Sequence, residues 1–261
     1  MRLLRKSVLD DFYPASDGKP MAETQVHVEL MASRYEMLRL WLRPRGIYLA
    51  ANMFLYYRKG DVKARKAPDI MAVKGVNVDV KRRSFKTWEE KAVPCWVLEL
   101  TSKKTAKEDQ GEKKELYRKL RVREYFLFDP LNDYLPEQLM GFRLVAGDYQ
   151  AMELEDDGGL TSKELGLRFV PEGDQLAVFD AATGKRVLSL EESHEHSEFL
   201  AEQLESLQAR TDLLQKESSA AQRRAQESQK KLEEQARKLA EMEAELARLK
   251  AAQKGKSNGV R

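Results

Sequence analysis

Residues 93–130 read VPCWVLELTSKKTAKEDQGEKKELYRKLRVREYFLFDP, and this stretch decides the fold. Its first eight residues are almost continuously apolar, which is typical of a strand covered on both faces. Residues 122–128 form a second β-prone run, and the segment between the two runs places apolar residues at helical spacing, at Leu116, Tyr117 and Leu120. A strand, a helix and a strand in this order predict a crossover in a partly parallel sheet.

The neighbouring segments extend this α/β core. Helical spacing of apolar residues predicts a core helix over residues 22–42, followed by one strand over 47–57. Residues 70–73 indicate a short buried strand that Asp69 opens. Short alternating runs separated by turn residues predict a β-meander from residue 139 onward, which extends or flanks the sheet.

Beyond Leu190 the chain has no proline, and its next glycine is Gly255. Two series of positions repeat every seven residues and predict a coiled coil: Leu200, Leu207, Leu214, Ala221, Ser228, Gln235, Met242 and Leu249, with Leu204, Thr211, Ser218, Ala225, Leu232, Leu239 and Leu246. A parallel dimer is the default, although small and polar core positions leave orientation and strand number open. An isolated solvated helix is the alternative.

These patterns predict four parts in the chain. A loose N-terminus covers residues 1–14, an α/β domain 15–190, a coiled coil 191–253 and a disordered basic tail 254–261. The formal charge of +3 is too small to indicate a nucleic-acid binder by itself. No apolar run reaches signal-peptide or membrane-spanning length, and the single cysteine is Cys95, so we expect a soluble cytoplasmic protein without a membrane partner.

Two acids and a lysine carry the chemistry that the sequence indicates. Asp69 and Glu99 each stand at the end of an apolar run, and Lys113 lies on the helix that follows. Carboxylates of this kind hold Mg²⁺ or Mn²⁺, and a lysine can orient a water or stabilise the charge of phosphodiester hydrolysis. The residues alone leave open a purely structural reading, in which Asp69 caps a turn and Asp109 pairs with Lys113.

The order of the motifs resembles a known family. The motifs are Pro68-Asp69, Leu98-Glu99-Leu100-Thr101-Ser102, Asp109 with Lys113 and Tyr117, and Glu124-Tyr125-Phe126 with Asp129-Pro130. This set resembles the Uma-two-type family of restriction endonucleases, within the PD-(D/E)XK nuclease superfamily. The resemblance covers residues 15–190 and implies a restriction-endonuclease-like mixed sheet core with flanking helices and a β-meander, here followed by a long α-helical coiled coil.

The resemblance also implies roles for single residues. Asp69 and Glu99 match the metal-binding acids of the family. Thr101 stands where the superfamily name places lysine, so the cation must come from elsewhere. Lys113 matches the lysine on the following helix and is the first candidate, and Lys103 is the second. Glu23 matches an additional acid on the first helix, although a surface pair between Glu23 and His27 is an equally simple reading.

The sequence therefore leads to two hypotheses of different classes. The first is a Mg²⁺-dependent (or Mn²⁺-dependent) DNA endonuclease, dimerised by its coiled coil, with phosphate contacts from Lys103, Lys104, Arg82 and Arg83. The second is a catalytically inactive nuclease-like domain that serves as a coiled-coil scaffold. A zinc site at His27 and a basic zipper in the C-terminal arm are both disfavoured by residue spacing and by the alternation of acids and bases.

Overall fold

The strand, helix and strand predicted over residues 93–130 form the centre of the structure. The computed structural model describes residue 13 and residues 25–257, with side chains up to residue 248. In it β6 (Trp96–Leu100) and β7 (Glu124–Phe128) pair in parallel. The helical segment between them consists of α4 (Ala106–Glu108), the π-helical turn η2 (Asp109–Lys113) and α5 (Lys114–Lys119). The predicted crossover is therefore confirmed.

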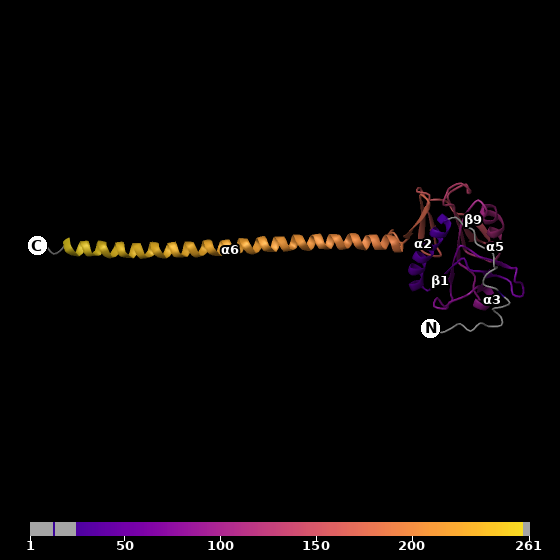
Figure 1. The fold of residues 1–261 in the computed structure, drawn as a ribbon, viewed down its shortest axis with the longest axis horizontal. Coiled ribbons are helices and arrows are strands. Elements are labelled where there is room, and N and C mark those ends of the chain that lie inside the picture. The colour runs from indigo at the N-terminus through magenta and orange to yellow at the C-terminus, as the bar shows by residue number, and fades with distance from the viewer. Residues whose placement is uncertain (1–12, 14–24, 258–261) are drawn as a thin grey trace. The chain divides into compact units, whose positions relative to one another are not determined.

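Antiparallel strands complete a mixed sheet in the order β1-β4-β6-β7-β8-β9. Its two edge strands, β1 and β9, are labelled in Figure 1. Its outer strands are β1 (Ile47–Ala51), β4 (Ile70–Lys74), β8 (Leu139–Val145) and β9 (Asp148–Ala151). Three short strands form the second sheet: β2 (Leu55–Tyr56), β3 (Arg65–Lys66) and β5 (Phe85–Lys86). Three more form the third: β10 (Leu160–Ser162), β11 (Leu167–Glu172) and β12 (Gln175–Asp180). The predicted meander thus both extends the main sheet and flanks it.

Side chains alternate between two apolar layers, one on each face of the main sheet. Trp96, Leu98 and Leu100 of β6 pack in one layer with residues of α2 (Gln25–Leu42) and of the β10–β12 sheet. Val97 packs in the other layer, which contains Tyr117 of α5. Glu99 has the same parity as Val97, so its carboxylate enters the second layer, on the side of the crossover helix.

The structure differs from the predicted elements in two ways. It contains two additional short helices, and one predicted strand is divided in two. Helix η1 (Arg43–Arg45) follows α2, and α3 (Thr87–Glu90) follows β5. The single strand predicted over residues 47–57 is wrong, because Asn52 adopts a φ of +47° and ends β1 there. Asparagine tolerates this left-handed conformation better than most residues. The chain then turns, so that β2 joins β3 and β5 instead of the main sheet.

The structure describes one residue of the predicted loose N-terminus. Tyr13 is buried, and its ring lies 5.0 Å from that of Tyr56 and 5.1 Å from that of Trp88. The other residues of 1–14, and residues 22–24 of the predicted first helix, lie outside the described residues.

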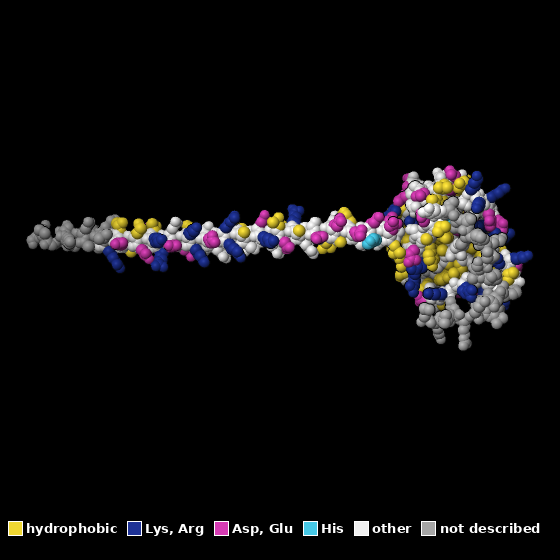
Figure 2. Space-filling view, in the orientation of Figure 1, with side chains coloured by type: hydrophobic (Ala, Val, Ile, Leu, Met, Phe, Trp, Pro, Cys, Tyr) yellow, Lys and Arg dark blue, Asp and Glu magenta, His cyan; other side chains and the backbone are white. Residues whose placement is uncertain are grey.

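The chain divides into two units, Met1–His194 and Glu195–Arg261. Helix α6 (Leu190–Ser257) contains the predicted coiled-coil segment and continues through residues 254–257, which the sequence assigned to a disordered tail. Lys and Arg side chains alternate along α6 with Asp and Glu side chains (Figure 2). In the described part of the chain, no helix combines the length and hydropathy needed to cross a bilayer.

Candidate active site

Asp69 and Glu99 are neighbours across two antiparallel strands. The register pairs Ile70 of β4 with Leu98 of β6, so Asp69 and Glu99 are the next residues outward on the two strands. The backbone N–H of Asp69 donates to Oε2 of Glu99 at 3.3 Å, and Oδ2 of Asp69 accepts from the N–H of Leu100 at 2.7 Å. Two acids that lie thirty positions apart in the sequence are therefore neighbours in the structure.

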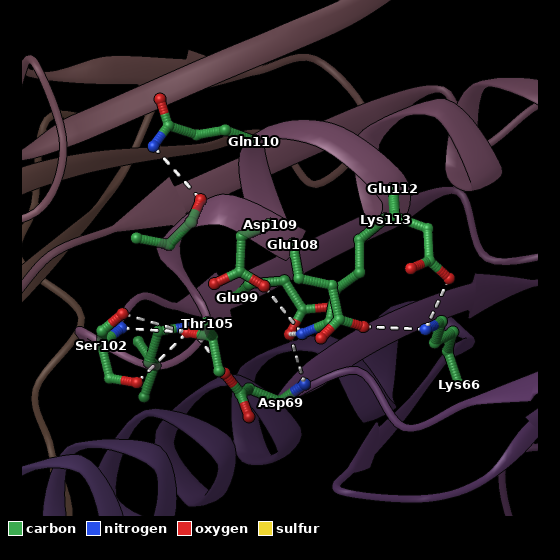
Figure 3. A network of polar contacts seen from close by, with 12 residues as sticks. Lys66, Asp69, Glu99, Ser102, Thr105, Glu108, Asp109, Gln110, Glu112 and Lys113 are labelled. Carbon is green, nitrogen blue, oxygen red and sulfur yellow. Dashed lines mark hydrogen bonds and ion pairs between the residues drawn. The ribbon is translucent and has the colours of Figure 1, made fainter.

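The crossover helix brings one ammonium group to this pair. Nζ of Lys113 lies 3.0 Å from Oε2 of Glu99 and 2.8 Å from Oδ1 of Asp109 (Figure 3). One turn further, the hydroxyl of Tyr117 donates to Oε1 of Glu99 at 2.8 Å. Asp109 and Lys113 are the first and last residues of the π-helical turn, a distortion that is frequent at functional sites.

Burial dominates the electrostatics of the site. The side chain of Glu99 is 0% exposed, that of Lys113 11% and that of Asp69 15%. Burial raises the pKa of Glu99 to about 8, with Lys113 opposing the rise and the charges of Asp69 and Asp109 adding to it. Burial also raises the pKa of Asp109, against the influence of Lys113. Three carboxyl groups thus share a single buried ammonium.

Lys113 is held in its charged form. Burial by itself lowers the pKa of Lys113, but Glu99 and Asp109 outweigh burial and raise that pKa above its ordinary value. An ammonium with a raised pKa is a poor general base and a good source of positive charge. A lysine in this environment is suited to orienting a water or stabilising negative charge, and poorly suited to removing a proton.

The two acids differ in how accessible they are to a metal ion. Glu99 already accepts hydrogen bonds from Tyr117, Lys113 and the backbone of Asp69. Oδ1 of Asp69 lies 3.4 Å from Nε2 of His27 on α2. Within the described residues, no three His, Cys, Asp or Glu side chains form a preformed metal-holding group. Carboxylate oxygens with excess negative charge nevertheless suit a hard divalent cation, and Asp69 is the more accessible ligand.

Lys113, rather than Lys103, reaches the acids. Lys103 is exposed on the turn after β6 and forms no ion pair with any described residue. Thr101 is buried, and its hydroxyl has no hydrogen-bond partner in the described part of the structure. Of the two candidate lysines, Lys113 on the following helix is therefore the one that contacts Glu99.

The four predicted phosphate contacts have different environments. Lys104 and Arg83 are exposed, as is Lys103. The guanidinium of Arg82 instead donates to both carboxylate oxygens of Glu90, at 2.6 and 2.8 Å, and lies 4.4 Å from the ring centre of Tyr48. Its side chain is only 5% exposed, so packing and the ion pair leave Arg82 few donors for a phosphate.

Sequence reasoning missed three members of the site. His27 was assigned to a surface pair, but it is buried beside Asp69. Asp109 and Tyr117 are among the motif residues that resemble the family, but the sequence assigned neither of them a role at the site. The signal for both was present, because Asp109, Lys113 and Tyr117 are spaced four apart and share one helix face. Glu23, the additional acid, lies outside the described residues.

Comparison with known proteins identifies the family of this chain. No curated protein matches the sequence. The crystal structure of a "putative nuclease belonging to DUF820" from Anabaena variabilis is similar, with a TM-score of 0.34 and 16% sequence identity over 58% of this chain and 81% of that chain. Residues 16–178 match the model of the Uma2 family, which is described as "Putative restriction endonuclease". The chain therefore belongs to the Uma2 family.

Proposed function

We propose that this protein is a divalent-metal-dependent endonuclease that hydrolyses phosphodiester bonds in DNA. The observation that carries the proposal is the convergence of Asp69, Glu99 and Lys113 from three elements of a chain in the Uma2 family. Asp69 and Glu99 would hold Mg²⁺ or Mn²⁺, which activates water and neutralises charge on the phosphate when bound. Lys113 would stabilise negative charge through its ammonium, and Lys103, Lys104 and Arg83 would contact neighbouring phosphates.

Metal-dependent cleavage tests this assignment. The full chain is incubated with supercoiled plasmid DNA and Mg²⁺ or Mn²⁺, and nicked and linear products are quantified with and without EDTA. We expect cleavage that EDTA abolishes, and Mn²⁺ binding that is at least about tenfold weaker in Asp69→Ala, since a carboxylate ligand is lost. Asp133→Ala, which removes an exposed acid, is the matched control. Cleavage that continues in EDTA would contradict the proposal.

A second candidate function follows from the burial of Glu99. A carboxylate that is fully buried and already accepts three hydrogen bonds has little freedom to bind a metal ion. Thr101 also stands at the position where the superfamily name places lysine. A domain of this kind that binds without cutting would act as a scaffold through its C-terminal helix. Plasmid that stays intact in Mg²⁺ and Mn²⁺, together with unchanged Mn²⁺ binding in Asp69→Ala, would favour this candidate.

Self-association through residues 191–253 is part of the proposal for both functions. Leucines at the predicted core positions of α6 are open to solvent in the single chain, from 46% exposed at Leu200 to 66% at Leu232. A regular apolar stripe on an otherwise polar helix is typical of a coiled-coil interface. In a DNA endonuclease, a dimer would bring two sites to one duplex.

The charges beside this stripe favour parallel chains in register. Lys238 of one chain would then face Glu243 of the other. A fully overlapping antiparallel pair would place Arg210 near Lys238 and Arg224 near its own copy. The same register would gain only the contact of Glu217 with Lys231. Because like charges at these flanking positions are unfavourable, the parallel arrangement has the lower electrostatic energy.

Sedimentation velocity tests the interface. Leu232→Lys with Leu239→Lys is expected to weaken self-association by roughly a hundredfold, because each chain then loses two buried leucines. Ala240→Lys with Ala244→Lys adds the same charge at positions outside the stripe and should leave the dimer intact. Equal sedimentation of the wild type and the Leu232→Lys/Leu239→Lys protein would show that the stripe is not the interface.

A further inference from the structure

Two basic segments adjoin the acidic site in the chain. Residues 57–66, which form most of the β2–β3 hairpin, contain five Lys or Arg and one acid. Residues 102–107, which comprise the turn after β6 and the first two residues of α4 and are called the turn 102–107 below, contain three lysines and no acid. Together they have a formal charge of +7, against +3 for the whole chain. Positive charge is therefore concentrated immediately before Asp69 and immediately after Glu99.

The hairpin is a well-ordered support for these cations. The N–H of Tyr57 donates to the carbonyl of Ala64 at 3.1 Å, and the N–H of Gly60, at the tip, donates to the hydroxyl of Tyr13 at 2.6 Å. Oδ1 of Asp61 accepts from the N–H of Lys63 at 2.9 Å. Hydrogen bonds thus fix the backbone of the tip, which lowers the entropy lost when its side chains bind a ligand.

Lys66 connects the hairpin to the helix that carries Lys113. Its Nζ lies 2.7 Å from a carboxylate oxygen of Glu108 and 2.9 Å from one of Glu112 (Figure 3). Glu108 follows the second basic segment directly, and Glu112 precedes Lys113. The double ion pair therefore holds both basic segments beside the acidic site, and it occupies the two acids that would otherwise repel a polyanion.

Five exposed lysines remain available in the two segments. They are Lys59, Lys63, Lys103, Lys104 and Lys107, and none has an ion-pair partner among residues 25–257. The other hairpin cations are engaged: Arg58 lies 3.3 Å from Asp61, and Arg65 lies 4.6 Å from the ring centre of Phe54. An excess of unpaired ammonium groups on a fixed backbone suits a ligand with regularly spaced negative charges.

We propose that the β2–β3 hairpin and the turn 102–107 form a contact surface for the sugar-phosphate backbone of duplex DNA on either side of the Asp69–Glu99 pair. The surface rests on the proposed function, because it gives the substrate of that same site its position. Lys59 and Lys63 contact phosphates on one side, and Lys103, Lys104 and Lys107 on the other. Contacts of this kind fix the position of the duplex without reading its base sequence.

Binding measured without cleavage tests the surface. Fluorescence anisotropy of a labelled DNA duplex is titrated with the full chain in EDTA at several salt concentrations. Lys59→Gln with Lys63→Gln is expected to raise Kd roughly five- to tenfold and to reduce the slope of log Kd against log salt by about two. Lys163→Gln with Lys185→Gln removes the same charge from exposed positions near the β10–β12 sheet and should change Kd by less than about twofold.

The outcomes separate this surface from the nuclease assignment, because plasmid cleavage in Mg²⁺ is measured on the same proteins. Wild-type affinity in the Lys59→Gln/Lys63→Gln protein, with normal cleavage by the wild type, would overturn the surface and leave the nuclease assignment intact. Equal weakening in the Lys163→Gln/Lys185→Gln control would also overturn it. Weakened binding confined to the hairpin variant would support the surface even if the wild type does not cleave.

Discussion

Glu99→Gln is expected to reduce DNA cleavage by roughly 10³-fold without destabilising the protein at pH 8. The loss of activity follows from the role proposed for Glu99 as a metal ligand, since several kcal/mol of transition-state stabilisation correspond to this factor. The stability follows from burial. Folding places the Glu99 carboxyl in a site with two other acids and one ammonium, which disfavours its charged form. A neutral amide avoids that penalty.

The shift in the pKa of Glu99 on folding determines how the stability of the wild type changes with pH. An unfolded glutamate ionises near 4.5, whereas burial raises the pKa of folded Glu99 to about 8. Between these values the folded state holds more protons than the unfolded state, so the contribution of Glu99 to stability falls as pH rises. Urea denaturation should therefore show the wild type losing stability relative to Glu99→Gln from about pH 5 to about pH 8.

Glu124→Gln is the matched control for this prediction. Glu124 is also buried, on β7, but Arg143 donates to it at 3.0 Å and the hydroxyl of Ser162 donates to its other oxygen. Its replacement should lower stability by about 2 kcal/mol, because the buried carboxylate loses its charge-assisted hydrogen bond from the partly exposed Arg143, and should leave cleavage by the folded protein intact. Equal loss of cleavage in both variants, or parallel pH profiles for Glu99→Gln and the wild type, would contradict the role of Glu99.

The central sheet and the family were predictable because each rests on local patterns. The continuous apolar runs around Glu99 and Tyr125 are typical of strands covered on both faces. The helical segment between the two runs predicts a crossover connection between parallel strands. The convergence of Asp69 and Glu99 followed from family order rather than from spacing, and the structure explains it by the register of β4 against β6.

Other features depend on contacts that no local pattern encodes. The conformation of Asn52 breaks an otherwise uniform β-prone run, and only the pairing of β2 with β3 and β5 shows why. The π-helical turn cannot be inferred from hydrophobic periodicity. Arg82 looked like a free cation in a polar loop, because its pairing with Glu90 and its stacking on Tyr48 depend on tertiary packing.

Lys113→Met is expected to destabilise the protein by about 3–5 kcal/mol near neutral pH, opposite in sign to Glu99→Gln. Removing the buried ammonium leaves the charge of Asp109 uncompensated and takes a hydrogen-bond donor from Glu99, whose raised pKa keeps it mostly protonated at neutral pH. The loss should shrink as pH falls, because burial raises the pKa of Asp109 and its carboxyl then binds a proton and becomes neutral. Lys119→Met, which removes an exposed lysine near Glu115, should cost less than about 0.5 kcal/mol.

The double variant Lys113→Met/Glu99→Gln separates charge balance from catalysis. If the ammonium stabilises the fold by balancing buried acids, removing one acid should restore part of the stability lost in Lys113→Met, with a coupling energy of roughly 1–3 kcal/mol in urea denaturation. Cleavage should remain lost, because neither the metal ligand nor the ammonium is restored. Additive stability losses would show that Lys113 and Glu99 act independently, and recovered cleavage would remove both residues from the proposed catalytic site.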